Sequence, residues 1–298
     1  MKILLLGKNG QVGWELQRSL APLGELVSLE RDSVDFCGDL SDLDGLAATV
    51  RRVAPDVIVN AAAYTAVDRA ESDADLCRTV NALAPGVLAL EAARIGALLV
   101  HYSTDYVFDG SGDAAWTENA ATGPLSVYGK TKLQGEQLIA DSACRHVIFR
   151  TSWVYAARGA NFAKTMLRLA AERERLSVVD DQFGAPTGAE LIADVTAHAL
   201  QTMRGGQDIG GIYHLAAAGQ TSWHGYASFV IECARQAGVI LKVGADGIVP
   251  VSSAAFPAPA PRPKNSRLAL HKVQKAFQLN LPPWQAGVAR MLTEFLER

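Results

Sequence analysis

The first 150 residues alternate between short apolar runs and segments in which apolar residues recur at helical spacing. A short apolar run bounded by turn residues is typical of a buried strand, and a period of about 3.6 residues is typical of an amphipathic helix. The pattern predicts strands at residues 2–6, 26–29, 57–59, 97–102 and 146–149, and helices at 11–20, 43–53, 76–95 and 128–139. Because strands that alternate with helices usually pair in parallel, we expect a sheet with helices on both faces.

Beyond residue 151 the alternation loosens. The pattern predicts helices at 161–173, 189–203, 222–237 and 283–296, and a strand at 211–215. The run FPAPAPRP at 256–263 contains prolines that remove backbone donors, so we expect a stiff extended loop, with a proline-rich docking motif as the alternative. We therefore predict an α/β protein: a Rossmann-like doubly wound parallel sheet over residues 1–150 binds a nucleotide. A smaller, less regular C-terminal substrate-binding domain spans 151–298, with some of its segments returning to the first domain.

Composition narrows the class of protein. The chain has 298 residues, a formal net charge of −3 and 49% hydrophobic residues, and its pI is near 6.1, so it offers no basic field for nucleic acid or an acidic membrane surface. Cys37, Cys77, Cys144 and Cys233 lack metal-type spacing, and the apolar run at the start is too short for a signal peptide or a membrane span. We expect free thiols and a cytoplasmic location.

A glycine-rich loop lies between the first predicted strand and the first predicted helix. It reads GKNGQVG, which has the form G-x-x-G-x-x-G. Glycines at these positions permit a tight turn and let a pyrophosphate approach the helix N-terminus, although a purely structural turn in another α/β protein is the alternative. The candidate dinucleotide contacts in this loop are Gly7, Gly10, Gln11, Val12 and Gly13.

The end of the second predicted strand carries two opposing signals. Glu30 can accept from the ribose hydroxyls of NAD, and the neighbouring Arg31 can bind the 2′-phosphate of NADP. Either side chain can equally be a solvated loop charge. The sequence therefore leaves the choice between NADPH and NADH open.

Two further segments are candidates for the cofactor side of the site. Asp39 and Leu40 lie in a short loop where we expect the adenine, and the third strand is followed by the small residues of segment 60–63, NAAA. Small side chains such as Ala62 and Ala63 leave room for ribose and phosphates, although packing alone explains alanines equally well.

Hydroxyl groups and a Tyr-x-x-x-Lys pair define a candidate catalytic side. Ser103 and Thr104 follow the fourth predicted strand, and we expect only one of them to face a substrate, since neighbouring strand residues point to opposite faces. Tyr128 and Lys132 are four residues apart and share a helix face. An ammonium beside the phenol is expected to lower the tyrosine pKa from ~10 and to make it a proton donor. The alternative is a partly buried tyrosine beside a solvated lysine.

The order of these motifs resembles the extended short-chain dehydrogenase/reductase superfamily. Within it, the chain is similar to the dTDP-4-dehydrorhamnose reductase branch through GKNGQVG, NAAAYTAVDRAE, HYSTDYVFDG, VYGKTKLQGE, FRTSWVYA, DQFGAPTG and RPKNSRL, which together cover it nearly end to end. The resemblance implies reduction of the C4 ketone of a dTDP-sugar, dTDP-4-dehydro-β-L-rhamnose, by NADPH or NADH. The product, dTDP-L-rhamnose, is a precursor of cell-surface polysaccharide such as O-antigen.

The resemblance also implies roles for individual residues. Tyr128 gives a proton to the ketone oxygen, Thr104 holds that oxygen, and Lys132 binds the nicotinamide ribose and lowers the tyrosine pKa. The sugar pocket would be lined by Asp105, Tyr106 and Trp153, with Arg262 of the proline-rich loop as a candidate for the diphosphate or the thymidine. Trp153 in the hydrophobic core is the alternative.

This family includes members that dimerise around Mg²⁺ held by glutamates. Glu15, Glu190 and Glu294 lie in the matching contexts GWELQ, GAELI and MLTEF, so the resemblance implies a homodimer with Mg²⁺ at its interface. Without the resemblance these are ordinary solvated helix charges.

Two other functions fit the same fold. One is a non-catalytic regulatory subunit, which the presence of Thr104, Tyr128 and Lys132 argues against. The other is a sugar-nucleotide epimerase or dehydratase, which keeps its cofactor bound and recycles it. Net consumption of reduced nicotinamide distinguishes the reductase from both.

Overall fold

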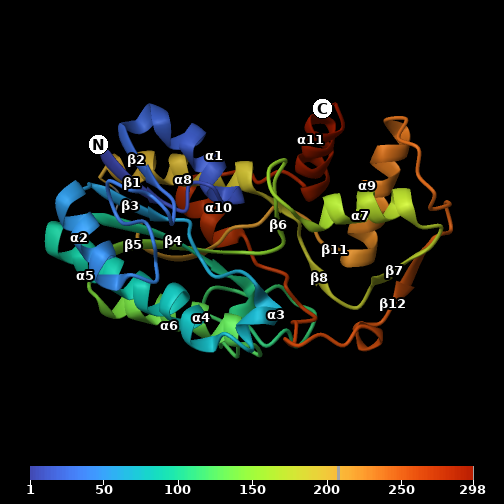
Figure 1. The fold of residues 1–298 in the computed structure, drawn as a ribbon, viewed down its shortest axis with the longest axis horizontal. Helices are drawn as coiled ribbons and strands as arrows, with labels where there is room; N and C mark the ends of the chain where they lie inside the picture. Colours follow the sequence, from blue (N-terminus) through green and yellow to red (C-terminus); the bar gives the residue numbers. More distant parts are fainter. Residues whose placement is uncertain (207–208, 298) are drawn as a thin grey trace.

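A six-stranded parallel sheet forms the centre of the computed structural model, which describes residues 1–206 and 209–297 (Figure 1). The strand order is β10-β5-β4-β3-β1-β2, and every neighbouring pair is parallel. The strands are β1 (Lys2–Leu6), β2 (Glu25–Leu29), β3 (Val57–Asn60), β4 (Leu98–Thr104), β5 (Arg145–Thr151) and β10 (Gly211–His214). The predicted doubly wound α/β fold is confirmed, and β10 brings a segment from beyond residue 151 into this sheet.

Helices cover both faces of the sheet. On one face lie α1 (Gln11–Leu20), α8 (Ala189–Arg204) and α10 (His271–Phe277); on the other lie α2 (Leu43–Val53), α5 (Ala84–Ile95) and α6 (Val127–Asp141) (Figure 1). Each face has its own apolar core, the first containing Leu16 and Ile192, the second Val50 and Leu88. Because both faces are covered, the inner strands are largely buried: all four residues of β3 are buried, and only the last of them, Asn60, is polar.

The predicted helix at 76–95 is interrupted, so its prediction as one regular helix was wrong. It consists of α4 (Ala74–Arg78), a π-helical turn (Thr79–Leu83) and α5. The buried Asn81 lies in the π turn; its Oδ1 accepts from Tyr64 N at 2.8 Å and its Nδ2 donates to Tyr64 O at 3.0 Å. These bonds to a distant loop hold the wider turn, and apolar spacing carries no trace of them.

A second region packs beside the sheet (Figure 1). It contains α7 (Phe162–Glu172), α9 (Trp223–Gln236) and α11 (Trp284–Leu296) around an apolar cluster that includes Tyr226 and Val288. Its short strand pairs are β6 (Val154–Tyr155) with β9 (Thr187–Gly188), β7 (Leu176–Val179) with β12 (Ile248–Val251), and β8 (Phe183–Gly184) with β11 (Thr221–Ser222). The short strands and α10 were not predicted. Strands of two to four residues have too few residues to display a period.

The proline-rich segment 256–263 contains no helix or strand, as predicted. It connects to the first region through Asp68 in the short helix α3 (Val67–Ala70), whose carboxylate accepts from Ala260 N at 3.3 Å and from Arg262 Nη2 at 2.7 Å. Two acceptor atoms of a single carboxylate thus hold this loop in place.

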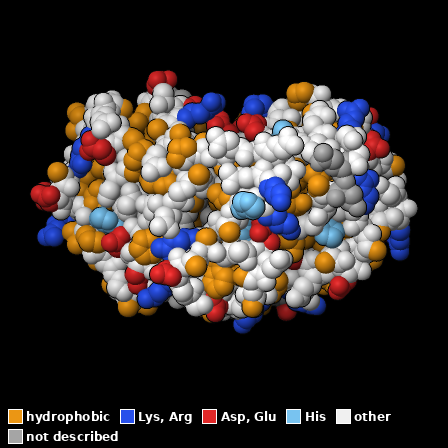
Figure 2. All heavy atoms as spheres, turned by 180° about the vertical axis from the view of Figure 1, so that it is seen from behind, with side chains coloured by type: hydrophobic (Ala, Val, Ile, Leu, Met, Phe, Trp, Pro, Cys, Tyr) orange, Lys and Arg blue, Asp and Glu red, His pale blue; other side chains and the backbone are white. Residues whose placement is uncertain are grey.

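The surface mixes charges of both signs. On the face shown in Figure 2, Lys and Arg side chains alternate with Asp and Glu side chains, and small hydrophobic areas lie between them. Among the helices of residues 1–206 and 209–297, none combines the length and the apolar character needed to cross a bilayer.

Substitution of Gly135 in α6 tests how closely this helix must approach the π turn. A Cβ atom on Gly135 would lie 2.3 Å from Asn81 O, a backbone atom that cannot turn aside, so Gly135→Ala is expected to destabilise the protein by about 2 kcal/mol. Gly86→Ala is the matched control: its Cβ would meet only the Leu138 side chain, at 3.3 Å, and should change stability by less than about 1 kcal/mol. Urea unfolding of the two variants measures the difference; equal midpoints would contradict the close approach.

Candidate active site

A cavity of about 1000 Å³ opens at the carboxyl ends of β1, β3, β4 and β5. Ligands in open α/β sheets bind at this edge. The structure brings most of the sequence-predicted residues to its walls: Gly7, Gly10, Gln11, Val12, Glu30, Arg31, Asp39, Leu40, Ala62, Ala63, Thr104, Asp105, Tyr106, Tyr128, Lys132 and Trp153. Residues far apart in the sequence thus line one open cavity.

The glycine loop is shaped by two close backbone approaches. Gly7 has φ +83°, a left-handed conformation that suits glycine, and a Cβ on Gly13 would lie 2.0 Å from Gly7 O. Gly13 lies beneath the loop and not on the cavity wall. Gly10 caps α1 without a side-chain hydrogen bond, so the first backbone donors of the helix stay available at the cavity, as a phosphate group requires.

Glu30 and Arg31 both reach the cavity, and both have local partners. Glu30 accepts a short hydrogen bond from Asn9 and pairs with Lys8 at 3.5 Å; Arg31 Nε donates to Asp39 Oδ2 at 3.2 Å. Burial alone would raise the pKa of Asp39, but the hydrogen bonds from Ser41, together with Arg31, hold it below its ordinary value. A carboxylate that can accept from a ribose and a guanidinium that can bind a phosphate thus both lie on the cavity wall. The geometry does not favour NADPH over NADH.

Thr104, Tyr128 and Asp105 form a polar cluster on the cavity wall. Thr104 ends β4, and Tyr128 lies in the first turn of α6, where Ser126 Oγ accepts from Gly129 N at 3.2 Å. The Thr104 hydroxyl is within hydrogen-bonding reach of the Tyr128 phenol and donates to Asp105 Oδ1 at 3.1 Å. Ser103 Oγ, by contrast, has no hydrogen-bond partner in the described part of the chain. The hydroxyl beside the phenol is thus that of Thr104.

The prediction that Lys132 lowers the pKa of Tyr128 was wrong. Burial raises the pKa of Tyr128 well above its usual value of 10. Lys132 does not offset this, because its Nζ lies against β4, donating to Tyr102 O at 2.6 Å and contacting His101 Nε2 at 3.0 Å. Burial also lowers the pKa of Lys132 to about 8.

Asp105 is a buried carboxylate with an unused acceptor. Only 2% of the residue is exposed, and burial raises its pKa to about 6 in spite of hydrogen bonds from Ser266 and Thr104. Its Oδ2 atom has no partner within the described residues. An unpartnered oxygen on the cavity wall can accept a hydrogen bond from a hydroxyl group of a bound ligand.

Trp153 lies at the end of the cavity formed by the second region. Its φ of +47° is unusual for a bulky residue, and its ring stacks on Trp223 with the centroids 3.7 Å apart. A Cβ on Gly184 would lie 2.8 Å from the Trp153 ring, so glycine is needed behind it. Sequence reasoning missed Trp223, which lines the same cavity, because nothing in its local pattern separates it from a core tryptophan.

Arg262 lies outside the lining of this cavity. It pairs with Asp68 at 2.7 Å and interacts with Tyr106, whose ring meets that of Tyr128 edge-on at 5.6 Å. A role for Arg262 toward a diphosphate stays a prediction.

The three glutamates of the expected metal site come near one another in the fold. Burial, together with the charges of Glu190 and Glu294, raises the pKa of Glu15, although Arg18 opposes them. Glu190 pairs with Arg290 at 3.2 Å. Over the described ranges, no group of three His, Cys, Asp or Glu side chains is close enough to hold a metal ion within one chain. The magnesium site stays a prediction.

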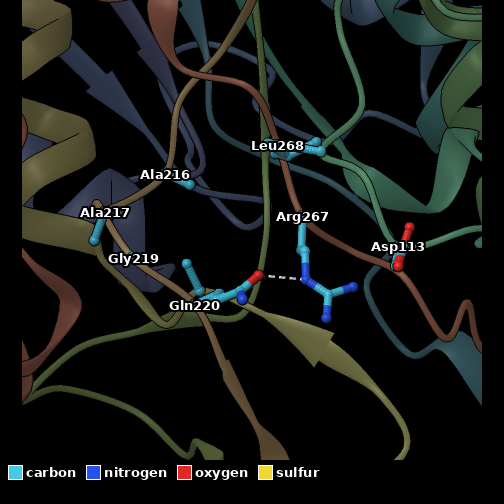
Figure 3. Close-up of a pocket in the computed structure, with 9 residues that line it drawn as sticks. Asp113, Ala216, Ala217, Gly219, Gln220, Arg267 and Leu268 are labelled. Carbon is cyan, nitrogen blue, oxygen red and sulfur yellow. Dashed lines mark hydrogen bonds between the residues drawn. The ribbon is translucent and has the colours of Figure 1, made fainter.

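A smaller cavity of about 280 Å³ contains none of the predicted residues (Figure 3). The Arg267 side chain lies on its wall and donates through Nε to Gln220 Oε1, and its guanidinium also meets Asn265 Oδ1 at 3.1 Å. Because the predicted residues line the larger cavity and none of them lines this one, the larger cavity is the candidate site.

The chain is similar to known proteins over nearly its whole length. A family model described as the RmlD substrate binding domain matches residues 1–297. The chain is 58% identical over 294 residues to the dTDP-4-dehydrorhamnose reductase of Salmonella typhimurium, covering 99% of this chain and 98% of that protein. Among solved structures, it is similar to the dTDP-4-dehydrorhamnose reductases of Clostridium acetobutylicum (32% identity, TM-score 0.90, 100% of both chains) and Bacillus anthracis. The latter, in complex with NADP, has 33% identity and TM-score 0.87, with 98% of this chain and 99% of that chain covered.

Asp105→Asn tests the electrostatic cost of the buried carboxylate. Since the folded protein binds the Asp105 proton more tightly than the unfolded chain does, stability is lost as pH rises from about 4 through about 6. The asparagine is therefore expected to stabilise the protein by up to about 3 kcal/mol at pH 7 and to have little effect near pH 4, in urea unfolding at both pH values.

Asp109→Asn is the control for this prediction. Hydrogen bonds from Ser111 hold the pKa of Asp109 below its ordinary value, so its neutralisation should bring no gain at pH 7. A similar gain in both variants would show that Asp105 is not specially strained.

Proposed function

Because the chain belongs to the RmlD substrate binding domain family, we propose that it is an oxidoreductase that reduces the C4 ketone of dTDP-4-dehydro-β-L-rhamnose. The reductant is NADPH or NADH, and the product is dTDP-L-rhamnose for cell-surface polysaccharide. The observation that carries the proposal is the position of the Tyr128 phenol, which lies beside the Thr104 hydroxyl in the cavity that the glycine loop also lines. We infer that the enzyme works in the cytoplasm.

The cavity fits a dinucleotide. The close approach of Gly13 to Gly7 O leaves no space for a side chain, and Gln11 Oε1 and Thr151 Oγ1 are buried without a partner in residues 1–206 and 209–297. Bound NAD(P)H supplies the hydride for the ketone carbon. The glycine loop, Glu30, Arg31, Asp39 and Leu40 would hold its phosphates, ribose and adenine.

Tyr128 donates the proton of the reduction. As the ketone oxygen gains negative charge, the phenol gives it a proton, and the Thr104 hydroxyl holds that oxygen in place. A raised pKa suits this direction of reaction, since burial keeps the phenol protonated at neutral pH. The neighbouring Lys132, whose own pKa is about 8, can return a proton to the phenolate that is left.

The remaining wall residues select the sugar nucleotide. Asp105 Oδ2 accepts from a sugar hydroxyl, and Tyr106 and Trp153 pack against the ring. Arg262 meets the diphosphate or the thymidine when it exchanges its contact with Asp68 for the ligand.

A single assay tests the proposal. Purified protein is mixed with the dTDP-4-keto-6-deoxysugar and either NADPH or NADH, with and without Mg²⁺, and the loss of reduced nicotinamide is followed. Substrate-dependent oxidation without any partner protein is expected. No turnover would favour the regulatory subunit, and product formation without net oxidation would favour an epimerase or dehydratase.

Tyr128→Phe removes the proton donor and little else. Turnover is expected to fall by about 100-fold or more, with cofactor affinity retained, because only the hydroxyl is lost. Tyr226→Phe is the matched control: its hydroxyl is buried without a partner in the described residues, so that variant should keep full activity. Steady-state kinetics and cofactor fluorescence titration measure both effects. Near-normal turnover of Tyr128→Phe would refute the assignment.

We also propose that two copies of the chain form a homodimer with Mg²⁺ held by Glu15, Glu190 and Glu294. The support is chemical: the charges of Glu190 and Glu294 add to burial in raising the pKa of Glu15, and a hard cation that prefers oxygen ligands relieves such repulsion. The cation would stabilise the assembly and take no part in the reduction.

Removal of the metal tests this assembly. Chelation with EDTA is expected to shift the protein from dimer to monomer in light scattering, and added Mg²⁺ should restore the dimer. Glu15→Gln should weaken the dimer in the same way, and the exposed Glu232→Gln should not. A dimer that is indifferent to both chelation and Glu15→Gln would contradict the proposal.

A further inference from the structure

A buried histidine lies directly behind Lys132 and has no part in the reaction proposed above. His101, on β4, is 1% exposed, and its Nε2 lies 3.0 Å from Lys132 Nζ. Its Nδ1 lies 3.2 Å from Nδ2 of Asn60, which is opposite His101 in the register of β3 and β4 and is also 1% exposed. We call these three residues the Lys132–His101–Asn60 chain.

The direction of the hydrogen bonds in this chain follows from its far end. Ala62 N donates to Asn60 Oδ1 at 3.2 Å, and a backbone N–H is always a donor. Asn60 therefore turns its Nδ2 to His101 and donates to Nδ1. A neutral imidazole that accepts at Nδ1 carries its proton on Nε2. The Nε2–H group thus points at Lys132 Nζ.

A histidine that donates to Lys132 requires a lone pair on Nζ. The neutral amine has one, and the ammonium has none. When Lys132 is protonated, His101 must instead accept at Nε2 and carry its proton on Nδ1, and Asn60 must rotate and lose the bond from Ala62. Tyr102 O, at 2.6 Å from Nζ, accepts from the lysine in either form. One proton thus occupies the contact between the two nitrogens.

We propose that His101 and Asn60 are positioning residues for Lys132: they hold its Nζ at the cavity wall and, through the fixed Ala62 N–H, favour the neutral amine. The proposal rests on the role of Lys132 in the proposed reduction. His101 keeps its charge when its tautomer changes, so the only net proton exchanged is that of Lys132. A lysine held in this way gives up its proton readily when Tyr128 needs one.

The other groups around Lys132 act in the opposite direction. Glu136 on α6 and Cys77 on α4 both raise the pKa of Lys132, yet burial outweighs them. Glu136 is held by Arg150 at 2.6 Å. Burial, and then the charge of Lys132, lowers the pKa of His101 well below 6.5, so His101 is neutral wherever Lys132 titrates.

The tautomer of His101 is the direct test. The protein has six histidines, and long-range ¹H–¹⁵N correlation spectra of ¹⁵N-histidine-labelled protein separate the two tautomers, with His101→Gln assigning the signal. Well above the Lys132 pKa of about 8, the Nε2–H tautomer is expected; well below it, Nδ1–H. The Nδ1–H form at alkaline pH, or one unchanging tautomer, would overturn the proposal. Because these spectra need no substrate, their result is independent of the reductase assay.

Asn60→Asp reverses the direction of the hydrogen bonds in the Lys132–His101–Asn60 chain with little change in the shape of the side chain. Its carboxylate accepts from both Ala62 N and His101 Nδ1, so the Nδ1–H tautomer should persist at all pH values. The limb of the kcat/KM profile that reports Lys132 should move up by about one pH unit or more. The charge of the carboxylate alone would also shift that limb. A shifted limb in a variant whose His101 tautomer still follows pH as in the wild type would therefore overturn the proposal.

Two substitutions at His101 separate positioning from packing. Glutamine retains a donor and an acceptor for Lys132, and leucine retains neither. His101→Leu is expected to lose about tenfold more kcat than His101→Gln. Equal losses would mean that His101 only fills space. If the leucine variant fails to fold, the wild-type and Asn60→Asp spectra still decide the question.

Discussion

The packing of α6 on β4 fixes the candidate site. Lys132 is 2% exposed, and a buried amine is tolerated only with partners, which Tyr102 O and His101 provide. Glycines let the helix approach closely: a Cβ on Gly129 would lie 2.3 Å from Tyr106 O, as would one on Gly135 from Asn81 O. Because α6 is held at these points, Tyr128 has only one position relative to Thr104 at the end of β4.

Burial then shifts the pKa values of the groups on this wall. It raises the pKa of Tyr128 and of Asp105, the latter to about 6, and lowers that of His101 and of Lys132, the latter to about 8. In each case the neutral form is favoured, because a charge inside the protein loses its hydration. A site of this kind supplies a proton from a neutral phenol, which is what the reduction of a ketone consumes. The stability lost in burying Asp105 is the corresponding cost.

Much of the fold was predictable, and the failures have physical causes. The helices at 11–20 and 43–53 match the structure in both bounds, since each carries a regular apolar stripe against the sheet. The π turn at 79–83 departs from regular spacing because Asn81 bonds to Tyr64. At the site, the glycine loop, Thr104 and the Tyr128–Lys132 pair were visible as motifs. His101 and Asn60 also lie in sequence motifs, but their contacts with Lys132 and with each other were not predicted, and neither was Trp223, because such contacts join different elements.

The sequence by itself determined which elements form and which chemical groups reach the carboxyl edge of the sheet, since periodicity and turn chemistry are local properties. Only the tertiary structure decided how those groups behave. Lys132 turns to β4 and not to the Tyr128 hydroxyl, and the phenol becomes less acidic where the spacing of the pair had predicted the opposite. The reason is that a pKa depends on burial and on the nearest partners, which are set by packing between distant segments and not by spacing along one helix.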